Sequence, residues 1–144
     1  MTANAAPPVP AGPPPLALCV DGNPRLLEIV AKILAALGVD CLTAADAGDA
    51  LAQARARYPQ LLILDWQLPQ TNGWELLDDL RAALAPRAPR VIILSAREDG
   101  FEPMLAENVA RADAYLEKPI DIDKFSREIC RLLELPLPGS APHA

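Results

Sequence analysis

The sequence predicts an α/β domain built around a parallel sheet, and two features of the chain support this fold class. Short apolar runs without polar alternation alternate with segments in which apolar residues recur every three or four positions. Uninterrupted apolar runs are typical of strands that are buried on both faces, as in parallel sheets. The spacing of three and four indicates amphipathic helices. The strand–helix alternation occurs five times, which is the pattern of consecutive βαβ units.

Five strands are expected from these apolar runs. The most uniform are Leu16–Val20, Leu61–Leu64 and Val91–Leu94, and Ala114–Leu116 is a shorter run of the same kind. The segment Val39–Thr43 mixes polar and apolar residues, which suits a strand at a sheet edge better than one in the centre.

Five helices are expected between and after the strands. Asn23 can cap the first, Pro24 suits its first turn, and Gly38 can end it. Either Asp46 or Gly48 opens the second, which reaches about Tyr58. The remaining apolar patterns predict helices over residues 74–84 and 101–109, and over residues 122–133 with Asp121 as cap. Five strands in such a series allow the flavodoxin-like, doubly wound order 2-1-3-4-5, in which ligands bind at the carboxyl ends of the strands.

Prolines and charges divide the 144 residues into a middle and two ends. Of 16 prolines, six lie in residues 1–15 and three in residues 136–144, and neither end contains Asp, Glu, Lys or Arg. The 120 residues of the middle are enough for one hydrophobic core. We therefore expect one domain over residues 16–135, with disordered tails over residues 1–15 and 136–144. We expect no output domain after residue 135, and therefore output through protein–protein contact.

Composition excludes several classes of protein. A formal net charge of −6 argues against a nucleic-acid-binding surface. The longest uncharged run, residues 1–20, is broken by prolines, so it suits neither a membrane span nor a secretory signal. The cysteines Cys19, Cys41 and Cys130 are widely spaced and are interpreted as buried apolar residues, with a redox or metal role as the alternative. We expect a cytoplasmic protein without nucleic-acid or membrane partners.

Four polar residues follow the predicted strands. Asp21 and Asp65 directly follow the first and third, Ser95 follows the fourth, and Lys118 lies two residues past the fifth. Each alone is more often a turn, a cap or a solvated charge, but together they favour a site at one sheet edge. Two carboxylates facing an ammonium suit a divalent cation such as Mg²⁺ and a transferring phosphoryl group. The only histidine is His143, in the C-terminal tail.

At these positions the chain resembles the response-regulator receiver domain of two-component signalling, over residues 16–135. The family motif is an aspartate with proline four and glycine eight residues later, which here is Asp65, Pro69 and Gly73. Ser95-Ala96 matches the Ser/Thr-Ala motif of the family. Lys118-Pro119, with an aromatic residue three positions before the lysine, matches its Lys-Pro motif.

The resemblance implies a role for each matching residue. Asp65 would accept a phosphoryl group from a histidine kinase or a phosphotransfer protein, and Lys118 and Ser95 would bind its oxygens. Tyr115 would be the switch aromatic that follows Ser95, with a cis peptide bond before Pro119. The metal ligands would be Asp21, Asp65 and the backbone carbonyl of Gln67. The resemblance also implies a signalling domain that accepts phosphate, in place of an enzyme with a substrate of its own.

Gly22 departs from the family pattern. The family has two adjacent acids after strand 1, and Gly22 takes the place of the second, which ligates the metal directly. Loss of a group that only orients a metal ligand typically weakens metal binding by about 10–100-fold. Loss of a ligand itself should therefore weaken Mg²⁺ binding at least as much. One fewer negative charge should also lower the pKa of Asp65 relative to other receivers and let Lys118 pair more directly with Asp65.

Two functions remain open from the sequence. The first is a single-domain response regulator that is phosphorylated on Asp65 despite a weakened metal site. The second is a degenerate receiver that binds a partner whatever its phosphorylation state. An aspartate-nucleophile phosphatase would need a second acid where the chain has Gln67. The expected output surface, on a monomer or weak homodimer, comprises Arg97, Phe101, Met104, Arg111, Tyr115, Lys124 and Arg131.

Overall fold

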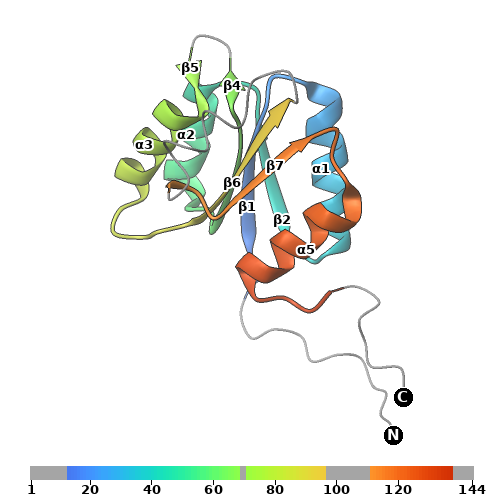
Figure 1. Cartoon of the computed structure of the whole chain (residues 1–144). Helices are drawn as coiled ribbons and strands as arrows, with labels where there is room; N and C mark the ends of the chain where they lie inside the picture. The colour runs from blue at the N-terminus through green and yellow to red at the C-terminus, as the bar shows by residue number, and fades with distance from the viewer. Residues whose placement is uncertain (1–12, 69–70, 97–110, 138–144) are drawn as a thin grey trace, which may run out of the picture.

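Five parallel strands form a central sheet in the order β2-β1-β3-β6-β7 (Figure 1). They are β1 (Leu16–Val20), β2 (Asp40–Ala44), β3 (Leu61–Asp65), β6 (Arg90–Ala96) and β7 (Ala114–Lys118). Counted within this sheet, the order is the predicted 2-1-3-4-5, and the mixed strand β2 lies at an edge as expected. The computed structural model describes residues 13–68, 71–96 and 111–137. Residues 1–12 and 138–144 of the expected tails, Pro69 and the predicted helix over residues 101–109 lie outside this description.

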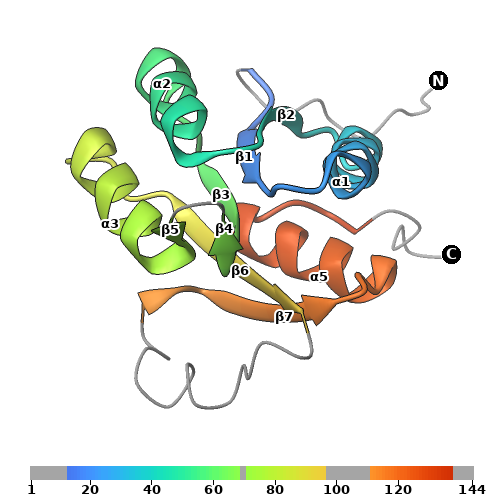
Figure 2. The same ribbon diagram turned by 90° about the horizontal axis from the view of Figure 1, so that it is seen from above.

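Four described helices cover the two faces of the sheet. Viewed from above, α1 (Pro24–Ala36) and α5 (Ile122–Leu133) lie on one face, and α2 (Ala47–Arg57) and α3 (Gly73–Leu84) lie on the other (Figure 2). Each face has its own hydrophobic core, because successive residues of a strand point to opposite sides. Leu18 and Val20 of β1 join the core under α2 and α3, whereas Ala17 and Cys19 join the core under α1 and α5.

The helix ends follow the capping residues in the sequence. The side chain of Asn23 accepts hydrogen bonds from the backbone N–H groups of Arg25 and Leu26, and Pro24 is the first residue of α1. Gly38 adopts φ of +79° directly after the last turn, a conformation that glycine adopts without steric cost. Of the two candidates for the start of α2, Asp46 is the cap, because its carboxylate accepts the N–H of Asp49 at 2.9 Å.

Several local features differ from the sequence prediction. β3, β6 and β7 extend to Asp65, Ala96 and Lys118, so Asp65, Ser95 and Lys118 lie within the strands that they were expected to follow. β2 begins at Asp40 and not at Val39, since the Val39 N–H donates to Leu34 O at 2.9 Å and so belongs to the end of α1. A small antiparallel pair, β4 (Gln67–Leu68) and β5 (Thr71–Asn72), follows β3 and was not expected. It brings the start of α3 back toward the end of β3.

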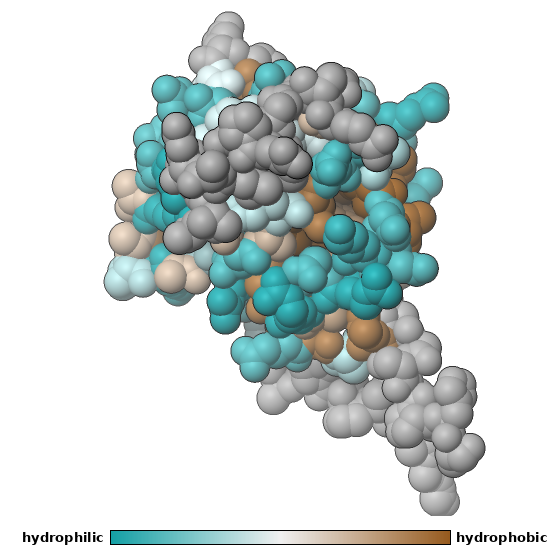
Figure 3. All heavy atoms as spheres, viewed as in Figure 1, coloured by the Kyte–Doolittle hydropathy of each residue, from teal (hydrophilic) through white to brown (hydrophobic). Residues whose placement is uncertain are grey.

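The described part of the chain contains no helix long and apolar enough to cross a membrane. Hydrophilic residues cover most of the described surface on the face of Figure 1, with hydrophobic areas between them on the right-hand side (Figure 3). The three cysteines are free thiols, with Cys19 and Cys130 buried and Cys41 half-buried. Burial raises the pKa of the Cys41 thiol to about 11, which keeps this cysteine in the thiol form at neutral pH.

Candidate functional site

Asp21, Asp65, Ser95 and Lys118 lie together at the carboxyl edge of the sheet, as the sequence predicts. Asp21 directly follows β1, Asp65 ends β3, Ser95 lies near the end of β6 and Lys118 ends β7. Asp21, Asp65 and Ser95 are the only buried polar or charged residues in the described part of the chain, with exposed fractions of 1%, 8% and 0%. Burial of polar groups is costly unless they are paired, so this cluster is the strongest candidate for a functional site.

The backbone around Asp65 is fixed on two sides. The Trp66 N–H donates to Leu94 O of β6 at 2.7 Å, and the Gly73 N–H donates to Trp66 O at 2.8 Å. The first turn of α3 lies directly against this segment, since a Cβ atom on Gly73 would lie 2.8 Å from Asp65 O. Glycine at position 73 is therefore required for the close approach of α3 to Asp65, which explains this part of the motif physically.

The two carboxylates have separate sets of partners. Asp21 Oδ1 accepts the Asn23 N–H at 2.8 Å, which closes a turn directly before α1. Asp65 Oδ1 accepts the Gln67 N–H at 3.2 Å, so the backbone of β4 also orients the Asp65 side chain. In both residues Oδ2 faces Lys118, and a single ammonium therefore connects β1, β3 and β7.

Lys118 forms ion pairs with both carboxylates. Its Nζ lies 2.7 Å from Asp21 Oδ2 and 3.2 Å from Asp65 Oδ2, and 22% of its side chain is exposed. The following peptide bond, Lys118–Pro119, is cis as expected. A second cis peptide bond, Ala85–Pro86, lies after α3 and was not predicted.

Two carboxylates and one ammonium leave one negative charge without a counter-charge within the cluster. Burial and the neighbouring charge of Asp21 raise the pKa of Asp65, although Lys118 and the Gln67 N–H act in the opposite direction. Burial lowers the pKa of Lys118, but its hydrogen bond and charge interaction with Asp21, together with Asp65, outweigh this and raise it overall. The cluster therefore favours the approach of an additional cation.

The residues present fit Mg²⁺, with fewer carboxylates than a site with two adjacent acids would have. Asp21, Asp65 and the backbone carbonyl of Gln67 would supply oxygen ligands, and Mg²⁺ usually needs only one or two carboxylates because it keeps several waters. Gly22, which follows Asp21, is exposed and has no side chain to contribute. No group of three or more His, Cys, Asp or Glu residues that could hold a metal occurs in residues 13–68, 71–96 and 111–137.

Ser95 and Tyr115 lie on adjacent strands, but their hydroxyl groups point to different partners. Ser95 Oγ donates to Ala96 O at 3.1 Å. The Tyr115 hydroxyl oxygen accepts the Ala112 N–H at 3.2 Å, near the start of β7 and away from Lys118. Burial raises the pKa of the Tyr115 hydroxyl above its usual value, against smaller opposing effects of the nearby backbone N–H groups.

Sequence reasoning missed the aromatic group beside the cluster. Trp74, known from the sequence only as part of the predicted helix over residues 74–84, packs edge-on against Trp66 with ring centroids 5.7 Å apart. Its ring lies 6.1 Å from that of Tyr115. It also missed Asn72, whose side chain caps α3 by accepting the N–H groups of Trp74 and Glu75. The sequence Asn-Gly-x-Glu was an available signal, because asparagine is a favoured cap and acidic residues suit the first turn.

Comparison with known proteins gives consistent matches. A family model described as the response regulator receiver domain matches residues 17–129. The chain is 37% identical over 110 residues to the transcriptional regulatory protein KdpE of Mycobacterium tuberculosis, which covers 76% of this chain and 47% of KdpE. It is 27% identical over 111 residues to Protein PilG of Pseudomonas aeruginosa, which covers 77% of this chain and 78% of PilG.

Solved structures agree in fold. The structure of a response regulator receiver domain (CheY-like) from Methylobacillus flagellatus superposes with a TM-score of 0.73 at 28% identity, covering 83% of this chain and 98% of that one. The chain spans about half the length of the transcriptional regulators among the curated relatives.

Proposed function

Because this chain belongs to the response regulator receiver domain family, we propose that it accepts a phosphoryl group on Asp65 within a two-component phosphorelay. The observation that carries this proposal is the position of Asp65 next to the Lys118 ammonium. Asp65 Oδ2 lies 3.2 Å from Lys118 Nζ at the carboxyl edge of the sheet, with Ser95 at the end of the neighbouring strand. This arrangement offers a nucleophile and a fixed positive charge in one place.

The transfer would use the carboxylate of Asp65 as nucleophile. One carboxylate oxygen forms a bond to phosphorus while the bond between phosphorus and the imidazole nitrogen of the donor histidine breaks, and the electron pair leaves with that nitrogen. Lys118 would hold a phosphoryl oxygen, and Ser95 would donate its hydroxyl to another. Mg²⁺, when bound, supplies further positive charge. The donor would be a histidine kinase or a phosphotransfer protein, and the signal would pass on by protein–protein contact in the cytoplasm.

The metal site would be an atypical one. Asp21, Asp65 and the Gln67 carbonyl would hold Mg²⁺ without the second acid, whose position is occupied by Gly22. Asp21 already has both oxygens engaged, by the Asn23 N–H and by Lys118. Metal binding would therefore compete with these contacts, which supports a weakened site.

The alternative is a receiver that binds its partner regardless of phosphate, and Gly22 is the observation that favours it. The two functions predict different behaviour of an Asp65→Asn variant, because asparagine keeps the shape of the side chain but cannot accept phosphate. Partner binding that depends on phosphorylation should be lost in this variant. Partner binding of a phosphate-independent adaptor should be the same in both proteins.

Tryptophan fluorescence and phosphate labelling test the proposal directly. Trp66 follows Asp65, so its emission should change when Mg²⁺ is titrated to millimolar concentration and then beryllofluoride, a phosphoryl mimic, is added. A labelled small phosphodonor such as acetyl phosphate should label the wild type and not Asp65→Asn. Absence of both the fluorescence change and the label would contradict phosphorylation on Asp65 and favour the adaptor.

A further inference from the structure

Arg111, the residue that begins the described segment before β7, is held against α3 by several contacts. Its guanidinium pairs with Asp78 and lies over the Trp74 ring, with its central carbon 4.8 Å from the ring centroid. Its Nη2 also lies 3.5 Å from Trp74 O, and its own carbonyl accepts a hydrogen bond from Arg81 Nη2 at 2.7 Å. Three residues of α3 therefore fix both the side chain and the backbone of Arg111.

The segment fixed in this way also holds Tyr115. The residue after Arg111 is Ala112, and its N–H donates to the Tyr115 hydroxyl at 3.2 Å. The Tyr115 ring packs against Trp74, whose ring also contacts the guanidinium of Arg111 and the ring of Trp66. Arg81 therefore anchors the peptide that donates to the Tyr115 hydroxyl, and Arg111 covers a ring that packs against Tyr115.

We infer that Arg111 is a positioning residue that holds Tyr115 in its observed conformer and opposes its movement toward Ser95. We call the contacts of Arg111 with Asp78, Trp74 and Arg81 the α3 clamp. The inference rests on the proposed function, in which Tyr115 follows Ser95 upon phosphorylation. Ser95 Oγ donates to Ala96 O, and Ser95 lies beside Glu117 near the end of β7, whereas the Tyr115 hydroxyl accepts the N–H of Ala112, which precedes β7. Tyr115 must therefore leave Ala112 before it can follow Ser95.

The contacts of Arg111 act together, so the clamp can hold Tyr115 in place although the Asp78 side chain is exposed. The Asp78 side chain is 65% exposed, and an isolated exposed ion pair contributes little. Arg111, however, also makes a cation–π contact with a buried ring, and such contacts are stronger where water is excluded. The indole N–H of Trp74 has no hydrogen-bond partner within the described residues, so packing and Arg111 hold this ring.

Fluorine NMR of a fluorotyrosine-labelled protein tests the clamp. The chain has two tyrosines, and Tyr58→Phe leaves Tyr115 as the only labelled position while keeping a ring beneath Arg87. Arg111→Gln and Asp78→Asn should each shift the Tyr115 resonance toward its position in the beryllofluoride-bound protein. Beryllofluoride should also saturate both variants at concentrations about two- to five-fold lower, because a less stable clamped conformer is displaced more easily.

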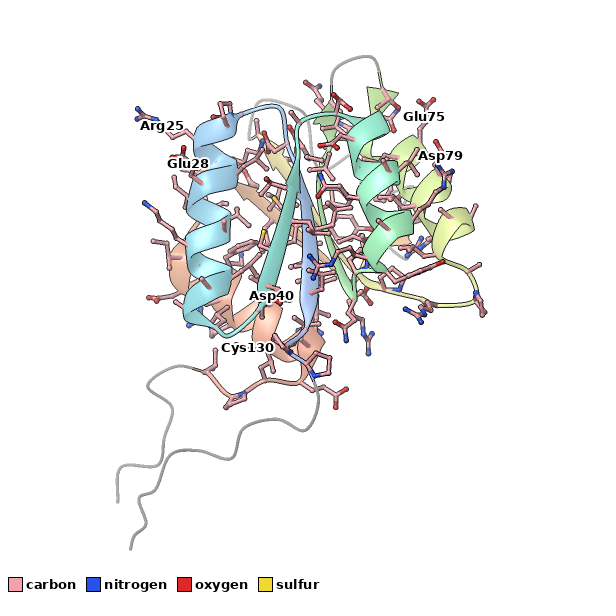
Figure 4. All side chains as sticks on the ribbon, turned by 180° about the vertical axis from the view of Figure 1, so that it is seen from behind. Arg25, Glu28, Asp40, Glu75, Asp79 and Cys130 are labelled. Atoms are coloured by element: carbon pink, nitrogen blue, oxygen red, sulfur yellow. The ribbon has the colours of Figure 1, made fainter. Side chains whose placement is uncertain are left out.

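Asp79→Asn is the matched control, because Asp79 is the next acid on α3, is exposed, and lies on the outer side of the helix (Figure 4). It should leave both the resonance and the beryllofluoride concentration unchanged. A Tyr115 resonance unmoved by Arg111→Gln and by Asp78→Asn, in proteins that remain folded, would overturn the clamp. Beryllofluoride that binds but leaves Tyr115 unmoved in the parent protein would instead contradict the switch role on which the inference rests. Failure of beryllofluoride to bind at all would contradict the proposed function.

Discussion

Lys118 forms its shorter ion pair with Asp21, at 2.7 Å, and its longer one with Asp65, at 3.2 Å. We expected the absence of an acid at position 22 to let Lys118 pair more directly with Asp65. The structure shows one ammonium shared by two buried carboxylates, with Asp21 as the closer partner. Lys118 therefore neutralises the negative charge of Asp65 only in part. Both carboxylates rely on the same ammonium as their positively charged partner.

Replacement of Lys118 by methionine should destabilise the fold and raise the pKa of Asp65 further. The variant removes the ammonium that pairs with two buried carboxylates, and breaking a buried pair on one side typically costs on the order of 3 kcal/mol. Urea denaturation at pH 7 measures the loss of stability, and carboxyl NMR measures the pKa. Lys124→Met, on the exposed side of α5, is the control. Equal stability of the two variants would mean that the ammonium does not stabilise the cluster.

Asp65→Asn should stabilise the protein at pH 7. The pKa of Asp65 is raised in the fold, so the folded state binds the proton more strongly than the unfolded chain, whose aspartates titrate near ~3.9. Ionisation of Asp65 is therefore less favourable in the folded state than in the unfolded chain. The free energy of unfolding falls as the pH rises from the pKa of Asp65 in the unfolded chain to its pKa in the fold, and it stays lower above that pH. Denaturation curves at pH 7 and below pH 4 should show a difference between variant and wild type that shrinks in acid. A difference that grows in acid would refute this assignment.

Gly22→Asp should increase Mg²⁺ affinity by at least about ten-fold, because it restores a carboxylate next to Asp21. Titration of the tryptophan emission with Mg²⁺ measures the change. Gly22→Asn is a control of similar size without the charge, and it should gain much less. Unchanged affinity in Gly22→Asp would mean that position 22 does not face the metal, and that the weakness of the site has another cause.

Gly73→Ala should destabilise the fold, whereas Gly48→Ala should stabilise it. A Cβ on Gly73 would lie 2.8 Å from Asp65 O, and forcing such contacts costs about 1–3 kcal/mol. A Cβ on Gly48, within α2, would meet only Asp46 Oδ1 at 3.5 Å, and alanine is favoured over glycine in helices by about 0.5–1 kcal/mol. Thermal unfolding of the two variants gives opposite shifts if this is correct. The same shift in both would show that α3 can move away from Asp65.

The sequence predicted the strands and the site residues, because both depend on patterns that are continuous along the chain. Apolar runs located four strands of the sheet and a mixed segment located the edge strand β2. The polar residues at the carboxyl ends of these strands identified Asp21, Asp65, Ser95 and Lys118. β4 and β5 were missed because two-residue strands have no periodicity to detect. The contacts of Arg111 were missed because an arginine before a strand is indistinguishable from a solvated one until its distance to α3 is known. Sharing of Lys118 between two carboxylates is likewise a matter of tertiary geometry.

The double attachment of the peptide after Asp65 has a consequence for how a signal could leave this site. Trp66 is bonded through its N–H to β6 and through its carbonyl to the first residue of α3. Because the Trp66 peptide is hydrogen-bonded to both β6 and α3, its backbone has little room to move. Addition of a phosphoryl group to Asp65 would therefore change the charge of the site without displacing this backbone. The surrounding side chains, with rotamers separated by low barriers, would then be the parts that respond to it.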